Sequence, residues 1–218
     1  MKLDLLIPKF NPSEPRSAIE NMKLLADDST ADILAFIHDD VTMIDPDWQE
    51  TVLDFMEHRP ECGLLGFGGA LGLGTDDIYK TPYRLQQLAR ISYWSGVRDA
   101  EVHGNRATDN MRVTMLDGFA LIFRREAYEA MGGWQTMLDM GLTFHMYDFA
   151  ACCMMERLEW EVWMLPLDCQ HHGGGTSVSP EYDSWLRGKG INGDSEIHTL
   201  AHEICYREFK DVLPWRVR

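Results

Sequence analysis

Two adjacent carboxylates, Asp39 and Asp40, follow an apolar run at residues 33–37, with only His38 between them and the run. Neighbouring acids repel each other and lose hydration at a cost, so a pair of this kind is typical of a cation site. Carboxylate oxygens hold hard divalent ions such as Mg²⁺ or Mn²⁺ while leaving coordination positions open for phosphate. Asp is also a common turn residue, so the alternative is that the pair only ends a strand and begins a turn.

The run at 33–37 is short for a helix and is bounded by polar residues, which predicts a strand buried on both faces of an α/β sheet. In open α/β sheets, ligands bind at the carboxyl ends of the strands, which is where the two acids lie. Further apolar runs predict strands at 3–7, 63–67, 113–123 and 161–165. Helical spacing or start signals predict helices at 17–27, from Asp45-Pro46 onward, after Arg124-Arg125, at 147–158 and near 197–209. In the second of these, Asp45 is expected to be the N-cap, with proline at the first helical position.

Composition narrows the classes of function. The formal net charge of −15 argues against nucleic acid as a partner, because a polyanion would be repelled. We find no run of 18 apolar residues, so we expect neither a membrane span nor a signal peptide. The five cysteines include no Cys-x-x-Cys pair, which favours reduced thiols and a cytoplasmic location. A phosphorylated ligand of so acidic a chain would need local neutralisation, which a bound divalent ion supplies.

Several short motifs succeed one another along the chain. They are His38-Asp39-Asp40-Val41, Pro46-Asp47-Trp48, Leu116-Asp117-Gly118 before an apolar strand and Arg124-Arg125, Gly132-Gly133-Trp134, Tyr147-Asp148 before a Cys-containing helix, and His171 two residues before Gly173-Gly174-Gly175. In this order and spacing the chain resembles the GT-A fold glycosyltransferases of the large family-two type, especially bacterial and phage-like members with His-Asp-Asp-Val. The resemblance covers roughly residues 17–177.

The resemblance implies a single domain with a GT-A-like (Rossmann-like) mixed sheet flanked by helices. It implies metal-dependent, inverting transfer of a sugar from a UDP-, GDP- or dTDP-linked donor to a hydroxyl of a glycan, lipid or protein acceptor. Residues 1–70 would form a shortened nucleotide- and metal-binding part, 71–112 an irregular acceptor-side insert, 113–177 the sugar, acceptor and catalytic part, and 178–218 a C-terminal tail. A homo-oligomer is left open.

The resemblance also assigns the chemistry to individual residues. Asp39 and Asp40 match the Asp-x-Asp-type motif that holds Mn²⁺ or Mg²⁺, and His171 matches a frequent third ligand. The alternative for His171 and His172 is a strand-end pair bonded to backbone. Asp148 matches the carboxylate that deprotonates the acceptor hydroxyl, although an Asp at a helix start is more often a cap.

The remaining expectations concern substrate contacts. Asp117 and Gly118 match a segment that lines the sugar pocket, and a glycine there allows close approach of the backbone to a ligand. The alternative is a strand bulge with a solvated Asp. Further expected substrate contacts are His38, His172 and Arg124. In the family, several strands and helices precede the Asp-x-Asp strand and build the nucleobase pocket. This chain has room for about one of each, so Pro8 and Asn11 are expected to form a minimal version.

Two other classes of function remain. The first is a degenerate binding module that keeps the fold without catalysis. The second is a metal-dependent phosphate-ester hydrolase, which would need a second metal or a nucleophile that the sequence does not indicate.

Overall fold

The computed structural model describes residues 1–73, 91–93, 101–102, 107–172, 179–213 and 215–216. Most of the acceptor-side insert predicted at 71–112 therefore lies outside the described residues. The same holds for the triple glycine at 173–175.

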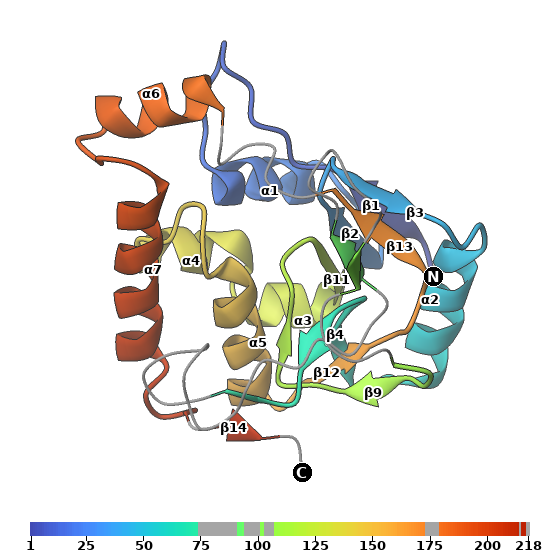
Figure 1. The fold of residues 1–218 in the computed structure, drawn as a ribbon. Coiled ribbons are helices and arrows are strands. Elements are labelled where there is room, and N and C mark those ends of the chain that lie inside the picture. The colour runs from blue at the N-terminus through green and yellow to red at the C-terminus, as the bar shows by residue number, and fades with distance from the viewer. Residues whose placement is uncertain (74–90, 94–100, 103–106, 173–178, 214, 217–218) are drawn as a thin grey trace.

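The described residues contain a six-stranded mixed sheet (Figure 1). Its order is β1 (Leu3–Leu6), β2 (Ile33–Ile37), β11 (Ala120–Arg124), β4 (Cys62–Gly66), β12 (Glu161–Met164) and β9 (Met111–Arg112). β1 and β2 are parallel, β4 and β12 are parallel, and β11 runs antiparallel to both of its neighbours. All five residues of β2 are buried, which confirms the strand predicted from the unbroken apolar run.

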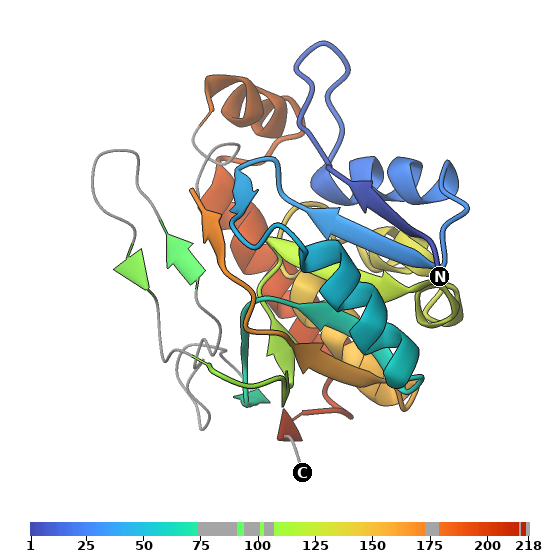
Figure 2. The same cartoon turned by 90° about the vertical axis from the view of Figure 1, so that its right-hand side faces the viewer.

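Helices cover both faces of this sheet. α2 (Trp48–His58) lies on one face, and α5 (Tyr147–Arg157) and α7 (Asp194–Glu208) lie on the other (Figures 1 and 2). α1 (Ala18–Asp27) packs against β1 and α4 (Gly133–Met140), and α3 (Arg125–Ala130) directly follows β11. Ser17 and Glu20 begin α1 with a reciprocal capping box, in which each side chain accepts from the backbone N–H of the other.

A second sheet lies beside the first and consists of β3 (Val41–Met43), β13 (Cys169–His171), β7 (Ile91–Tyr93) and β8 (Glu101–Val102), in that order. The antiparallel β3–β13 ladder places His171 opposite Val41. Two-residue strands form two further pairs, β5 (Gly69–Ala70) with β10 (Met115–Leu116), and β6 (Gly72–Leu73) with β14 (Trp215–Arg216).

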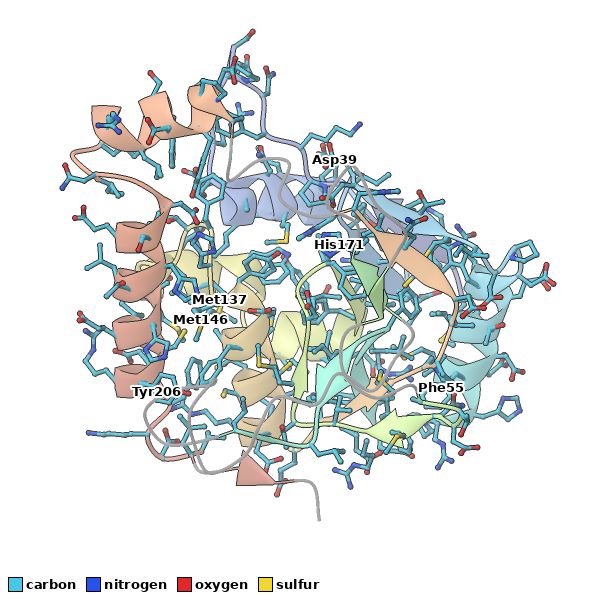
Figure 3. The ribbon with its side chains drawn as sticks, viewed as in Figure 1. Asp39, Phe55, Met137, Met146, His171 and Tyr206 are labelled. Carbon is cyan, nitrogen blue, oxygen red and sulfur yellow. The ribbon has the colours of Figure 1, made fainter. Side chains whose placement is uncertain are left out.

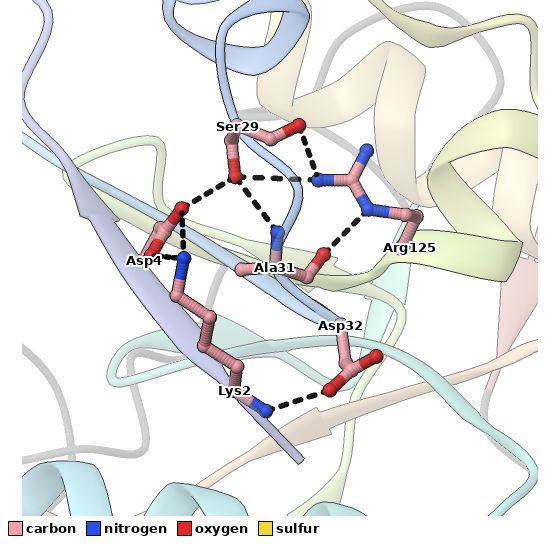
Figure 4. Close-up of polar contacts among 6 residues, drawn as sticks. All are labelled: Lys2, Asp4, Ser29, Ala31, Asp32 and Arg125. Carbon is pink, nitrogen blue, oxygen red and sulfur yellow. Dashed lines mark hydrogen bonds and ion pairs between the residues drawn. The ribbon is translucent and has the colours of Figure 1, made fainter.

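Polar contacts anchor the amino ends of β1 and β2 (Figure 4). The Arg125 guanidinium donates to the carbonyls of Ala31 and Ser29, and the Ser29 hydroxyl donates to Asp4 at 2.7 Å. The backbone N–H of Lys2 donates to the Asp32 carboxylate at 2.7 Å. These contacts secure the amino ends of the two strands, whose register is set by the parallel ladder that pairs Leu3 with Ile33 and Leu6 with Phe36.

Two helix starts differ from the expectation. α2 begins at Trp48, so the prediction that Asp45 caps it was wrong; the Asp45 carboxylate instead accepts from the backbone N–H of Asp168 at 2.6 Å. α6 (Pro180–Gly188) was not predicted, although its start carries a recognisable signal. The Ser179 hydroxyl accepts from the Tyr182 N–H at 3.1 Å, with proline at the first helical position. None of the described helices has the length and apolar character needed to cross a membrane.

Candidate active site

His38, Asp40 and His171 form the one group of candidate metal ligands found among the described residues. One ligand atom from each lies within 4.8 Å of the others. His171 Nε2 is 3.2 Å from Asp40 Oδ1, and His38 Nδ1 is 3.9 Å from the same oxygen. The Asp40 carboxylate therefore stands between two imidazoles.

The two sheets bring these three side chains together. His38 directly follows β2, and its N–H donates to the Phe119 carbonyl at 2.9 Å, next to the start of β11. The β3–β13 ladder carries His171 to the same place, because the N–H of His172 donates to the Asp40 carbonyl at 2.9 Å. The His171 ring stacks on Phe119 at a centroid distance of 5.2 Å.

The protonation preferences and contacts of this group suit a cation. The hydrogen bond from His171 is the main cause that lowers the pKa of Asp40, and burial is the main cause that lowers the pKa of His38. His38 Nε2 lies 2.7 Å from the Tyr147 hydroxyl, which orients the ring and leaves Nδ1 towards Asp40. Metal-binding histidines are commonly held in this way through their second nitrogen.

The structure places the expected metal ligands unequally. Asp40 and His171 belong to the group, whereas the exposed Asp39 lines the adjoining cavity without belonging to it. Figure 3 shows Asp39 and His171 on the same side of the molecule, near β13. His38, expected to contact substrate, takes the third position. Residues 38–41 form a turn in which the Val41 N–H donates to the His38 carbonyl at 3.3 Å, so strand alternation does not apply and the sequence carried no signal that His38 would join Asp40.

Asp148 lies in the first turn of α5. Its Oδ1 accepts from the Phe149 N–H at 2.8 Å, as a helix-start carboxylate does, and its Oδ2 accepts from the Gly118 N–H at 3.1 Å. Burial, followed by the nearby charge of Asp117, raises the pKa of Asp148 from 3.8 to about 7, while the two hydrogen bonds act in the opposite direction. Asp148 is thus a carboxylate that titrates near neutral pH.

One cavity of about 280 Å³ adjoins all of these groups. Its lining includes both Asp148 and the His38–Asp40–His171 group. Other expected site residues in the lining are Pro8, Asp39, Asp117 and Gly118. Gly118 fits tightly, because a Cβ there would come within 2.8 Å of the Tyr147 hydroxyl. The lining also contains residues that the sequence did not indicate, namely Lys9, Phe10, Ala18, Asn21, Met22, Phe144, His145, Met146, Tyr147, Tyr182 and Asp194.

Three residues expected to contact the nucleotide or the substrate lie outside the cavity lining, namely Asn11, His172 and Arg124. Asn11 is exposed and accepts from the Ser13 N–H at 3.0 Å. His172 lies behind Asp40, with Nε2 at 3.3 Å from the Thr42 hydroxyl.

Arg124 is not brought to this site either. It pairs with Ile33, at the end of β2 away from His38, and its guanidinium donates to the carbonyls of Met56, Arg59 and Cys62. Its contacts there secure the end of α2 and the start of β4.

Comparison with known proteins identifies the class. Residues 10–177 match the family described as "Glycosyltransferase like family", which is most of the chain, and the protein belongs to that family. The mixed sheet flanked by helices is the GT-A-like fold expected from the sequence. No curated protein matches the chain.

Two solved structures are similar to parts of it. The crystal structure of GalNAc-T7 with UDP, GalNAc and Mn²⁺ aligns at 11% identity and a TM-score of 0.49, over 80% of this chain and 35% of that one. The chain thus spans about a third of the length of that protein. The crystal structure of A197 from STIV aligns at 14% identity and a TM-score of 0.42, over 80% of this chain and 87% of that one.

Proposed function

We propose that the protein is a metal-dependent, inverting glycosyltransferase that moves a sugar from a nucleotide-diphosphate donor to an acceptor hydroxyl. One observation carries the proposal: a carboxylate with a pKa of about 7 and a His-Asp-His group open into the same cavity. The first suits a general base, and the second suits the cation that a pyrophosphate requires. Membership of the glycosyltransferase-like family supports this reaction class.

His38, Asp40 and His171 would hold the ion. Their donor set is one carboxylate oxygen and two imidazole nitrogens, which suits Mn²⁺ better than Mg²⁺, because Mg²⁺ prefers oxygen ligands and keeps several waters. When bound, the ion supplies Lewis-acid stabilisation of the departing nucleoside diphosphate. Asp39, exposed on the cavity wall, would face the donor rather than ligate, and Pro8 would contact the nucleotide.

Asp148 would be the general base. Its carboxylate takes the proton of the acceptor hydroxyl as that oxygen bonds to the anomeric carbon, and the bond from the anomeric carbon to the diphosphate oxygen breaks in the same displacement. A single displacement inverts the anomeric configuration. The N–H groups of Gly118 and Phe149 hold the carboxylate in place, and a pKa of about 7 matches its proton affinity to neutral conditions. Asp117, which lines the cavity together with Asp148, would accept a hydrogen bond from a hydroxyl of the transferred sugar.

The test is turnover of UDP-, GDP- and dTDP-sugars by the whole protein, with Mn²⁺ and with Mg²⁺, scoring both release of nucleoside diphosphate and transfer. We expect Mn²⁺-dependent release that is lost in Asp40→Asn and reduced at least about a hundredfold in Asp148→Asn. The matched control is Asp54→Asn, which changes an exposed acid on α2.

Three outcomes would contradict the proposal. Unchanged activity in Asp40→Asn removes the metal argument, and nucleotide binding without turnover indicates the non-catalytic module. NMR showing retained anomeric configuration in the product removes the single displacement.

A further inference from the structure

Residues of the C-terminal segment line the cavity, although this segment lies beyond the part of the chain that matches the family. The match ends at residue 177, whereas α6 begins at Pro180 and α7 at Asp194. Tyr182 on α6 and Asp194 on α7 nevertheless line the same cavity as Asp148. In Figure 1, α6 lies above α1 and α4, and α7 stands beside α4 and α5. Part of the cavity wall therefore lies outside the stretch that matches the family.

This wall presents aromatic rings. The Phe144 and Tyr182 centroids are 4.6 Å apart with the rings tilted by 66°, and Phe10 meets Tyr182 edge-on at 6.0 Å. Tyr182 is buried, while Phe10 and Phe144 remain partly exposed where they line the cavity. Trp185 packs against all three rings and supports them from behind. The apolar face of a sugar ring packs favourably on such a surface.

The wall also presents a fixed carboxylate. Asp194 Oδ1 accepts from the Tyr182 hydroxyl at 2.8 Å and from His145 Nε2 at 2.7 Å, so its orientation is set by two separate segments. About a third of the Asp194 side chain is exposed (36%). A carboxylate has about four acceptor positions, which leaves capacity for hydroxyl donors of a ligand.

The wall and Asp148 are joined through one segment of the chain. Phe144, His145 and Asp148 belong to one continuous stretch of the lining, 144–148, in which Met146 adopts a left-handed conformation with φ of 61°. Within this cavity, Phe144, His145 and the α6–α7 wall are therefore available to the atoms next to an acceptor hydroxyl that reaches Asp148.

The charge of the cavity restricts the acceptor further. Five carboxylates belong to the lining, against one lysine, Lys9, and three histidines; they are Asp39, Asp40, Asp117, Asp148 and Asp194. With the pyrophosphate of the donor assigned to the metal, a second phosphate on the acceptor side would be repelled. The aromatic rings, the hydrogen-bond-accepting carboxylate of Asp194 and the negative charge of the lining lead to one conclusion. We infer that the α6–α7 segment forms an acceptor subsite for an uncharged saccharide, which Asp194 and the Phe10–Phe144–Tyr182 wall recognise. This inference depends on the proposed function.

The test distinguishes an effect on acceptor binding from an effect on donor binding. With Mn²⁺ and an accepted sugar nucleotide, Asp194→Asn and Phe144→Leu should raise the KM for methyl glycosides about tenfold or more, while donor hydrolysis to water changes less than about twofold. Asp183→Asn is the matched control, because Asp183 pairs with Arg187 on the exposed side of α6. Asp194→Asn keeps an oxygen for both Tyr182 and His145, so its fold should be preserved.

Saturation-transfer NMR with methyl glycosides, sugar phosphates and nucleosides, without donor, gives a readout that does not need turnover. We expect the uncharged glycosides to bind in preference to the sugar phosphates, with this binding lost in Asp194→Asn while nucleoside binding is unchanged. If the variants instead weaken nucleoside binding or raise the KM for the donor, the wall is a nucleobase pocket and the inference is wrong. Preference for sugar phosphates also overturns it. If the wild type releases no nucleoside diphosphate, the proposed function fails by itself, and the NMR result still decides whether the wall binds a saccharide.

Discussion

The stability of Asp148→Asn relative to the wild type should increase as the pH rises from 5 to 7. Burial and the charge of Asp117 raise the pKa of Asp148 from 3.8 to about 7. The folded state therefore binds this proton more tightly than the unfolded state does. Below a pH of about 3.8 the carboxyl is protonated in both states and does not change the free energy of unfolding. As the pH rises further, the unfolded state ionises first, so the free energy of unfolding falls until the pH passes about 7.

The magnitude follows from the size of this shift. One pKa unit corresponds to about 1.4 kcal/mol, so a single such group lowers the free energy of unfolding by about 2.5 kcal/mol between pH 5 and pH 8. Because the carboxyl faces a cavity that admits water, screening reduces this value, and we expect about 1–2.5 kcal/mol. An asparagine accepts only one of the two N–H groups that Asp148 holds, which costs about 1–3 kcal/mol at every pH. The pH dependence of the difference is thus the informative quantity.

Denaturant unfolding of the wild type and Asp148→Asn at pH 5, 6, 7 and 8 measures it, with Asp54→Asn as the control for an exposed acid. We expect the stability of the variant relative to the wild type to improve steadily between pH 5 and 7 and to level off above 7. A difference that stays constant with pH would mean that Asp148 has an ordinary pKa, and the reasoning for a base poised near neutrality would be refuted.

Three further substitutions probe the supports of the site. Tyr147→Phe removes the hydroxyl that orients His38, and Mn²⁺ affinity should fall about tenfold with the circular dichroism spectrum unchanged; undiminished affinity argues against a ligand role for His38. Gly118→Ala pushes a methyl group against the Tyr147 ring, and we expect a loss of about 1–3 kcal/mol in denaturant unfolding together with reduced turnover. Arg124→Met removes the guanidinium from three carbonyls at the end of α2 and the start of β4, of which the Arg59 carbonyl keeps the Cys62 N–H, so unfolding should become easier by about 2–4 kcal/mol while calorimetry finds Mn²⁺ affinity unchanged. Weakened Mn²⁺ binding would contradict this placement of Arg124.

The sequence predicted those features that depend on local pattern. The unbroken apolar run 33–37 has to be buried on both faces, and it is the strand that ends at the candidate metal group. The motifs shared with glycosyltransferases predicted the GT-A-like fold, because their order follows the order of the strands and helices. The Asp45 cap failed because Asp168, distant in sequence, offers its N–H to the same carboxylate.

The features of the site that the sequence did not predict depend on contacts between distant segments of the chain. The β3–β13 register determines which side chains after β2 lie beside His171. They are His38 and Asp40, and not Asp39. The aromatic wall joins Phe10, Phe144 and Tyr182 from three regions of the chain, and no local periodicity connects them. The raised pKa of Asp148 arises from burial and from Asp117, which the sequence alone does not place beside it.

Binding of Mn²⁺ by matched variants tests the central claim most directly, namely that His38, Asp40 and His171 hold a cation beside Asp148. Titration calorimetry should find one site in the wild type, weakened at least about tenfold in Asp40→Asn and in His171→Ala, and changed less than about threefold in Asp39→Asn. Equal Mn²⁺ affinity in the wild type and in Asp40→Asn, or a loss confined to Asp39→Asn, would contradict the account.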